Sequence, residues 1–179
     1  PRNPAGLERD AGAVVRAALG AASGRGARPL FLWVHLFDAH DPYEPAEPWR
    51  SRHADDPYQG EIARVDAALA DLEAGLTSVL GGEPALWVVV ADHGEGLGEH
   101  GEDTHGYFLY EPTVRVPFLL AGPGVARGRV VPGPVGIVDV APTILHRLGL
   151  EVPAGLDGSP LRDGAAQRNL YLETLLPLR

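Results

Sequence analysis

The sequence predicts an α/β fold, a layered sandwich in which helices flank a mostly parallel central sheet. Two short apolar runs, residues 29–37 and 87–91, lack the polar alternation of half-exposed strands, which indicates strands buried on both faces. Between these runs, residues 58–80 repeat apolar side chains at intervals of three and four, which is typical of a helix with one buried face. A strand, a helix and a second strand in succession predict a right-handed crossover that makes both strands parallel members of one sheet.

The remaining segments add two helices and shorter strands. Asn3 and Pro4 are typical of an N-cap and a first helical position, and apolar side chains recur at helical spacing from there to Leu19. Residues 44–57, rich in Pro and charged side chains, predict an irregular surface loop. Later patterns predict a strand over 114–121 that Pro117 weakens, a short hairpin or strand at 127–134, a helix over 138–148 and an edge strand at 170–173.

The composition is that of a single domain over residues 1–179. The hydrophobic content of 45% is enough for one buried core in a chain of 179 residues. Because the formal net charge is −9 and the acidic residues are scattered, we expect no nucleic-acid partner and no anionic membrane surface. The chain has no Cys, which excludes disulfides, thiolate metal ligands and a cysteine nucleophile within it, and all 15 basic side chains are Arg.

Nothing in the sequence assigns a cellular compartment. Every apolar run is shorter than the roughly 20 residues that span a membrane, and no segment resembles a signal peptide. The chain opens on Pro1 and contains no Met, so we expect it to be part of a longer product or a processed form, whose preceding segment would carry any export signal or membrane anchor.

Ionisable side chains follow each of the two apolar runs. Asp92 and His93 come directly after residues 87–91, and Gly94 and Gly96 allow a sharp turn there. In open α/β sheets, ligands gather outside the carboxyl ends of the strands. A carboxylate beside an imidazole suits a divalent metal, although an Asp in this place also commonly caps a turn. The segment after residues 29–37, with Asp38 and His40, repeats the pattern.

Six motifs in order resemble the sulfatase family of the alkaline phosphatase superfamily, specifically the C-terminal portion of its catalytic domain. The motifs are HLFDAHDPY, YQGEIARVDAAL, ADHGEGLGEHG, THGYFLYEPTVRVPFLLAGPG, VDVAPTILHRLG and LDGSPL. The resemblance implies an alkaline-phosphatase-like fold and hydrolysis of a sulfate or phosphate ester at a divalent metal, through a covalent intermediate on a side-chain nucleophile.

The resemblance also assigns roles to four residues. Asp92 and His93 match a pair of family metal ligands, and the imidazole of His93, where many calcium-dependent relatives have Asn, shifts the expected ion from calcium toward manganese or zinc. His40 matches a histidine that contacts the transferred group or the leaving oxygen. His105 lies near the place of a family lysine that holds the sulfate, a contact that this Lys-free chain must make through His105 or lose. Asp38 would be a ligand only in a two-metal relative.

The chain departs from the family pattern because it lacks the nucleophile motif and the first acidic metal ligands, which relatives carry in an N-terminal half. We therefore expect an incomplete, alkaline-phosphatase-like sheet, and a chain that is inactive alone and needs the missing N-terminal half as its partner. The complete protein would act on a small-molecule or glycan sulfate ester. Two alternatives stay open, namely a phosphodiester or phosphonate hydrolase or phosphoethanolamine transferase on the same scaffold, and a non-catalytic module that keeps the fold.

Overall fold

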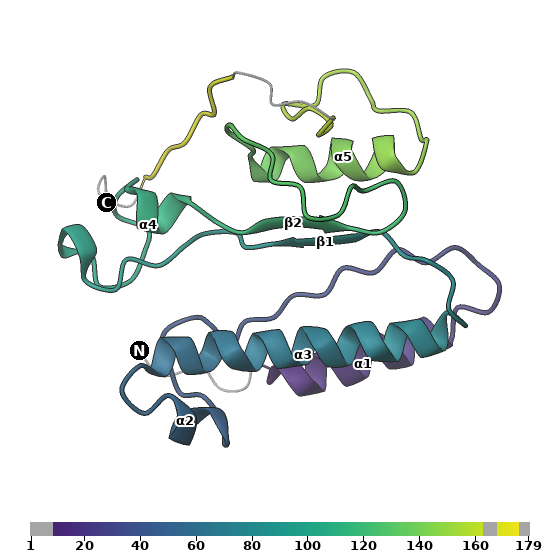
Figure 1. The fold of residues 1–179 in the computed structure, drawn as a ribbon. Helices are drawn as coiled ribbons and strands as arrows, with labels where there is room; N and C mark the ends of the chain where they lie inside the picture. Colours follow the sequence, from purple (N-terminus) through teal and green to yellow (C-terminus); the bar gives the residue numbers. More distant parts are fainter. Residues whose placement is uncertain (1–8, 163–167, 176–179) are drawn as a thin grey trace. The chain divides into compact units, whose positions relative to one another are not determined.

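The computed structural model describes residues 9–162 and 168–175, which belong to two compact units, Pro1–Pro84 and Ala85–Arg179 (Figure 1). We call them the first and second unit and describe each by itself.

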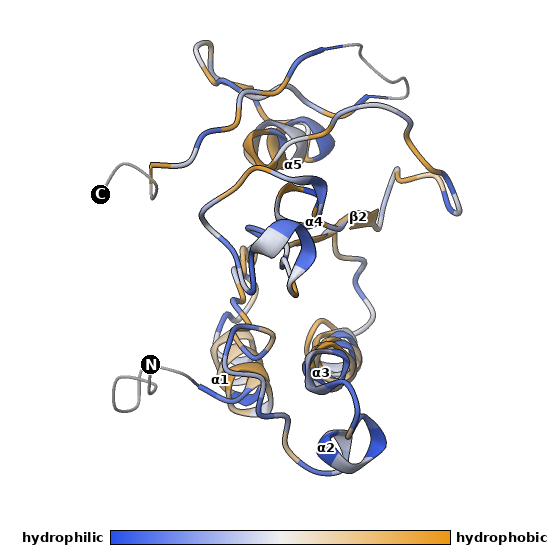
Figure 2. Ribbon diagram, turned by 90° about the vertical axis from the view of Figure 1, so that its left-hand side faces the viewer, coloured by the Kyte–Doolittle hydropathy of each residue, from blue (hydrophilic) through white to orange (hydrophobic). Residues whose placement is uncertain are grey.

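The first unit is built on two helices that lie side by side, α1 (Ala11–Ser23) and α3 (Pro57–Val79) (Figures 1 and 2). Their contact buries small and branched apolar side chains at helical spacing: Ala11, Val15, Ala18 and Ala22 of α1, and Ala68, Leu72 and Leu76 of α3. A Cβ added to Gly75 would lie 2.5 Å from Leu19 Cδ1. Gly75 therefore lets the two helices approach closely, and the apolar periodicity of residues 58–80 correctly predicted α3.

Side-chain caps fix where both long helices begin. Asp10 accepts a hydrogen bond from Ala13 N–H (3.1 Å), and Asp56 accepts one from Gln59 N–H (3.0 Å) ahead of Pro57. The first helix was predicted to start at Pro4, whereas α1 starts after Asp10, which caps it directly in front of its buried positions. Asn3 and Pro4 lie outside the described residues.

The connection between α1 and α3 differs from the sequence prediction in two places. Residues 29–37 take no regular secondary structure, so the predicted strand there is wrong. Their exposure still alternates, with Phe31 and Trp33 exposed at 72% and 82% and their neighbours half-buried. The pattern shows an extended backbone, but a strand also requires ladder hydrogen bonds from a neighbour. Residues 44–57 contain the short helix α2 (Trp49–Arg52), which is largely hydrophilic (Figure 2).

The second unit holds one two-stranded antiparallel sheet. In the described residues, β1 (Trp87–Val90) pairs with β2 (Phe118–Ala121), and Trp87 lies opposite Ala121. The strand at 87–91 was predicted correctly, but a parallel sheet is not found among these residues, because an apolar run does not specify the direction of its partner. β2 begins only after Pro117, which has no N–H for a ladder. Residues 127–134, predicted as a short hairpin or strand, and residues 170–173, predicted as an edge strand, take no regular structure.

Where it is described, the second unit also contains four short helical segments. They are the 3₁₀ turns η1 (Glu99–Gly101) and η2 (Ile137–Asp139) and the helices α4 (Glu111–Val114) and α5 (Val140–Arg147). Segments η2 and α5 confirm the helix predicted over 138–148. Within the described residues, no helix is long and apolar enough to cross a membrane.

A buried aspartate ties the C-terminal segment to α5. Asp139 is fully buried and accepts hydrogen bonds from Gly136 N–H (2.9 Å) and Ser159 N–H (2.8 Å), and its carboxylate also pairs with Arg168. A Cβ on Gly158 would lie 1.8 Å from Val138 O, so only glycine allows this approach. These contacts bind together two of the motifs quoted above, VDVAPTILHRLG and LDGSPL.

Candidate functional site

Asp92 and His93 follow β1 after one residue, Ala91, and lie at the surface of the second unit. The Asp92 side chain is 78% exposed, and its Oδ1 accepts a hydrogen bond from His93 N–H (3.2 Å). His93 Nδ1 lies 2.8 Å from the carbonyl oxygen of Gly94. Because a carbonyl only accepts, Nδ1 carries the proton and the lone pair belongs to Nε2.

The two side chains offer donor atoms at a spacing that one ion can bridge. His93 Nε2 and Asp92 Oδ1 lie 3.9 Å apart, and nitrogen and oxygen ligands bind zinc at about 2.0–2.2 Å each. A histidine that donates its other ring N–H to a carbonyl is the usual arrangement at metal sites. The pair thus fits part of a coordination sphere. Over residues 9–162 and 168–175, no group of three or more His, Asp or Glu side chains has the geometry of a metal site.

Close backbone approaches shape the loop after His93. Gly94 N–H donates to Thr113 O (2.8 Å) and Gly96 N–H donates to Thr104 O (2.6 Å), so the chain folds back on itself twice. A Cβ on Gly94 would lie 2.0 Å from Pro112 O, and one on Gly96 would lie 2.4 Å from Glu102 O. Neither glycine has a left-handed φ. The glycines predicted to serve a sharp turn are needed instead for these approaches.

The folded loop brings His105 against His93. The two imidazole rings stack with their centroids 3.8 Å apart and their planes 25° apart. His105 Nδ1 lies 3.1 Å from Glu95 Oε1, and the Glu95 side chain is only 4% exposed. The sequence patterns singled out both histidines but not Glu95. Glu95 lies between Gly94 and Gly96, and nothing in its local sequence predicts its burial.

A second buried glutamate holds the segment that carries His105. Glu102 is 4% exposed, and its carboxylate accepts hydrogen bonds from Tyr107 N–H (2.6 Å) and Phe108 N–H (3.3 Å). The hydroxyl of Thr174 donates a hydrogen bond to the carbonyl oxygen of Gly106, the residue that follows His105. His100 lies on the same loop and stacks on Tyr110 at 4.0 Å, a structural contact.

His40 and Asp38 belong to the first unit, in the turn after residues 29–37. His40 stacks on Phe37 with ring centroids 4.4 Å apart, and its Nδ1 lies 2.6 Å from Asp41 O. Asp38 Oδ1 accepts from Ala11 N–H (2.9 Å) and from Arg64 Nε (3.1 Å), and Arg64 also pairs with Asp10. The Asp38 carboxylate therefore links α1 to α3.

The first unit also contains a buried carboxyl group with a displaced pKa. Glu61 of α3 is 5% exposed, and its pKa is raised to about 7, first because burial disfavours the charged form and second because Asp38 is negative. In the second unit, Arg115 pairs with Glu111 on an exposed face, with 3.7 Å between the charged atoms.

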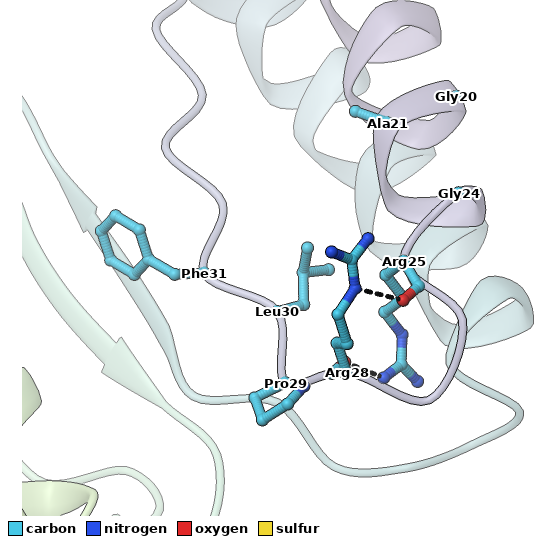
Figure 3. A pocket seen from close by; sticks show the side chains of 8 residues that line it. All are labelled: Gly20, Ala21, Gly24, Arg25, Arg28, Pro29, Leu30 and Phe31. Atoms are coloured by element: carbon cyan, nitrogen blue, oxygen red, sulfur yellow. Dashed lines mark hydrogen bonds between the residues drawn. The ribbon is translucent and has the colours of Figure 1, made fainter.

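A hollow of about 390 Å³ in the first unit contains none of the candidate residues (Figure 3). It lies between the end of α1 and residues 28–31. The side chains of its two arginines donate hydrogen bonds to backbone carbonyl oxygens. Arg25 donates to Arg28 O (2.7 Å), and Arg28 donates to Arg25 O (3.1 Å). We assign this hollow no chemistry.

Comparisons with known proteins agree on one family. The model of the Sulfatase family matches residues 8–150. Arylsulfatase K of Mus musculus is 33% identical over 104 residues, covering 58% of this chain and 19% of that protein. Arylsulfatase K of Homo sapiens is 32% identical over the same length and the same shares. The Extracellular sulfatase SULF-1 homolog of Drosophila melanogaster is 40% identical over 82 residues, covering 46% of this chain and 7% of that protein.

The matched part spans about a fifth or less of the length of these relatives. Among solved structures, that of a 2-O GAG sulfatase is similar with a TM-score of 0.48 and 17% identity, covering 84% of this chain and 44% of that one.

Proposed function

Since the chain belongs to the sulfatase family, we propose that the protein carrying it hydrolyses sulfate monoesters and that this chain supplies part of the active site. The observation that carries the proposal is the pair Asp92–His93 at the end of β1, with His105 stacked on His93, in a member of this family. Both units would belong to a single catalytic domain, of which they would form the C-terminal portion. The nucleophile and the remaining acidic ligands would come from an N-terminal half.

We propose that Asp92 and His93 hold a divalent metal ion. The ion, when bound, would supply electrostatic activation of the ester oxygens and of the nucleophile. Two features of this chain support the assignment: the 3.9 Å spacing of the two donor atoms, and the Gly94 carbonyl that leaves the lone pair of His93 on Nε2. The candidates are calcium, manganese and zinc, and the imidazole donor favours manganese or zinc over calcium.

The two other histidines would act on the substrate itself. We assign His105 to the group that is transferred, where its Nε2 would hold a sulfate oxygen in place of the absent lysine. We assign His40 to the same group or to the leaving oxygen, which a histidine can protonate. The organic half of the substrate, small molecule or glycan, would be selected by other loops, such as residues 44–57.

The test is turnover of an aryl sulfate and an aryl phosphate by the complete protein, together with its metal content. We expect hydrolysis of the sulfate, and loss of both the metal and about a hundredfold or more of the activity in Asp92→Ala. Asp103→Ala is the matched control, because Asp103 is an exposed aspartate of the same unit. Its metal content and turnover should equal those of the native protein.

The alternatives give different results in the same assay. Turnover of the phosphate alone would move the protein to the phosphoryl-transfer branch of the superfamily. Absence of metal and of turnover with either ester would contradict the enzyme proposal and favour a non-catalytic module.

A further inference from the structure

Four consecutive large apolar side chains are exposed shortly after His105. They are Tyr107, Phe108, Leu109 and Tyr110, which are 54%, 45%, 44% and 44% exposed. We call residues 107–110 the aromatic segment. Single apolar side chains are ordinary on a protein surface, but a contiguous group with polar residues around it commonly marks a binding site.

Buried polar groups hold the backbone of the aromatic segment. The carboxylate of Glu102, a residue that is 4% exposed, accepts hydrogen bonds from Tyr107 N–H (2.6 Å) and Phe108 N–H (3.3 Å). The hydroxyl of Thr113, a residue that is 6% exposed, lies 3.0 Å from both Phe108 O and Tyr110 O. The main chain is therefore fixed from inside while the rings stay outside. Rings on a fixed backbone lose little conformational freedom when they bind a ligand.

The aromatic segment begins two residues after His105, to which we assigned the transferred sulfate group. An extended chain spans at most about 3.5 Å per residue, so the Cα atoms of His105 and Tyr107 are at most about 7 Å apart, and those of His105 and Phe108 at most about 11 Å. A sulfate ester joins its sulfur to its organic half through a single oxygen. The organic half of an ester whose sulfate is held by His105 therefore lies within reach of the first two rings of the segment.

The ring of Tyr107 is the most available of the three. The ring of Tyr110 already stacks on His100 with centroids 4.0 Å apart, and Phe108 lies tilted against Tyr110 at 5.6 Å. In the described part of the chain, Tyr107 has neither a ring contact nor a hydrogen bond of its hydroxyl. Tyr107 and Phe108 can thus offer ring surface to a bound molecule.

The charges around the aromatic segment favour an uncharged occupant. Residues 106–110 carry no charge, while Asp103 before them and Glu111 after them are exposed carboxylates. Arg115, the exposed cation nearest along the chain, is paired with Glu111. A second anionic group on the organic half would meet these carboxylates without a free cation to balance it, whereas an uncharged ring can stack on Tyr107 and Phe108.

We propose that Tyr107 and Phe108 are specificity-determining residues, which stack on an uncharged ring in the organic half of the ester while its sulfate is held beside His105. This proposal rests on the proposed function in so far as the bound molecule is a substrate. Binding of a ring beside an anionic head group does not itself require turnover, so the two can be tested apart.

The first measurement is the binding of two sulfonates to the complete protein, followed by fluorine NMR. The probes are 4-fluorobenzenesulfonate and trifluoromethanesulfonate, which share an anionic sulfonate head group and have no ester bond to hydrolyse, and only the first carries a ring. We expect the ring compound to bind more tightly. Tyr107→Ala and Phe108→Ala should each raise its Kd by about five- to tenfold and change that of trifluoromethanesulfonate by less than about twofold.

Two further variants serve as controls. Tyr107→Phe keeps the ring and removes only the hydroxyl, so it should bind 4-fluorobenzenesulfonate as the native protein does. Val130→Ala shortens an apolar side chain of the same unit that is 87% exposed, and it should change neither Kd. Because Tyr107 and Phe108 are about half exposed, their alanine variants should keep a melting temperature close to that of the native protein.

The second measurement is the kinetics of 4-nitrophenyl sulfate hydrolysis by the same variants. The organic ring does not react, so its contact with Tyr107 stabilises the ground state and the transition state alike. We expect KM to rise in Tyr107→Ala by about the factor seen for the ring sulfonate, and kcat to stay within about threefold of the native value.

The outcomes separate this proposal from the proposed function. Absence of binding of 4-fluorobenzenesulfonate, an unchanged Kd in both alanine variants, or an equal loss for both sulfonates would overturn the role of the rings. A large fall of the melting temperature in Tyr107→Ala would also overturn it, because the ring would then be packed in the complete protein. Ring-dependent binding without turnover of any ester would contradict the proposed function and support the ring site.

Discussion

Glu61 makes the stability of the first unit depend on pH in a predictable direction. The ordinary pKa of a glutamate carboxyl group is 4.5, and in the folded chain burial raises the pKa of Glu61 to about 7, with a further contribution from the negative charge of Asp38. A backbone hydrogen bond from Glu44 and the charge of Arg50 act in the opposite direction but are weaker.

The sign follows from which state binds the proton. Between pH 4.5 and about 7 the folded chain keeps the proton on Glu61 while the unfolded chain has lost it, so stability falls as pH rises through this window. Above about pH 7 both states are ionised and the loss is complete. The displacement of the pKa from 4.5 to about 7 corresponds to a loss of about 3 kcal/mol in the free energy of unfolding.

The substitution Glu61→Gln removes this charge and keeps the shape of the side chain. We expect the variant to be more stable than the native chain by about 1–3 kcal/mol at about pH 8, and nearly equal to it at about pH 5. The buried amide also needs an acceptor. Among the described residues, Asp38 Oδ2 is a buried oxygen without a hydrogen-bond partner, and it is the acceptor that we expect the amide to use.

Urea unfolding followed by far-UV circular dichroism measures the effect, because α1 and α3 of the first unit are the longest helices described. Glu73→Gln, the same change at an exposed position of α3, is the control and should leave the pH dependence intact. The reasoning is refuted if Glu61→Gln and the native chain lose the same stability between these two pH values.

Two further substitutions test the second unit. Gly96→Ala should lower the free energy of unfolding by about 1–3 kcal/mol and disturb the Asp92–His93–His105 site, since its Cβ would lie 2.4 Å from Glu102 O and 2.7 Å from Thr104 O, both backbone atoms. A melting temperature equal to that of the native chain would contradict this. Asp139→Ala should cost about 3–5 kcal/mol, because it leaves Arg168 and two backbone N–H groups without their buried carboxylate. If the C-terminal segment resists proteases equally well in that variant and in the native chain, Asp139 does not hold this segment in place.

Periodicity predicted the helices better than the strands. The run 58–80 became α3 because an amphipathic stripe can be satisfied by any apolar surface on one side. Residues 29–37 and 87–91 have equally apolar sequences, yet only the second forms a strand. A strand requires a hydrogen-bonded neighbouring strand, which its own sequence does not specify. The neighbour of β1 is β2, which pairs with it in the antiparallel direction.

Contacts with other segments also decided where α1 begins and which groups Asp38 binds. The sequence pattern singled out Asn3 and Pro4 as a helix start, whereas α1 begins after Asp10, next to its buried stripe. Asp38, considered as a ligand in a two-metal relative, joins α1 to Arg64 of α3 through its Oδ1. The roles of Asp92, His93, His105 and His40 in catalysis stay predictions.

The sequence by itself determined the family, through the order and content of its motifs, and it singled out the residues that we propose for the reaction. Only the tertiary structure decided which of these residues meet. His105 reaches His93, and Glu95 reaches His105, because Gly94 and Gly96 let distant backbone carbonyls approach where any Cβ would collide. The identity of a residue is local, but contact between residues distant in sequence depends on how the intervening chain folds back, which no single motif specifies.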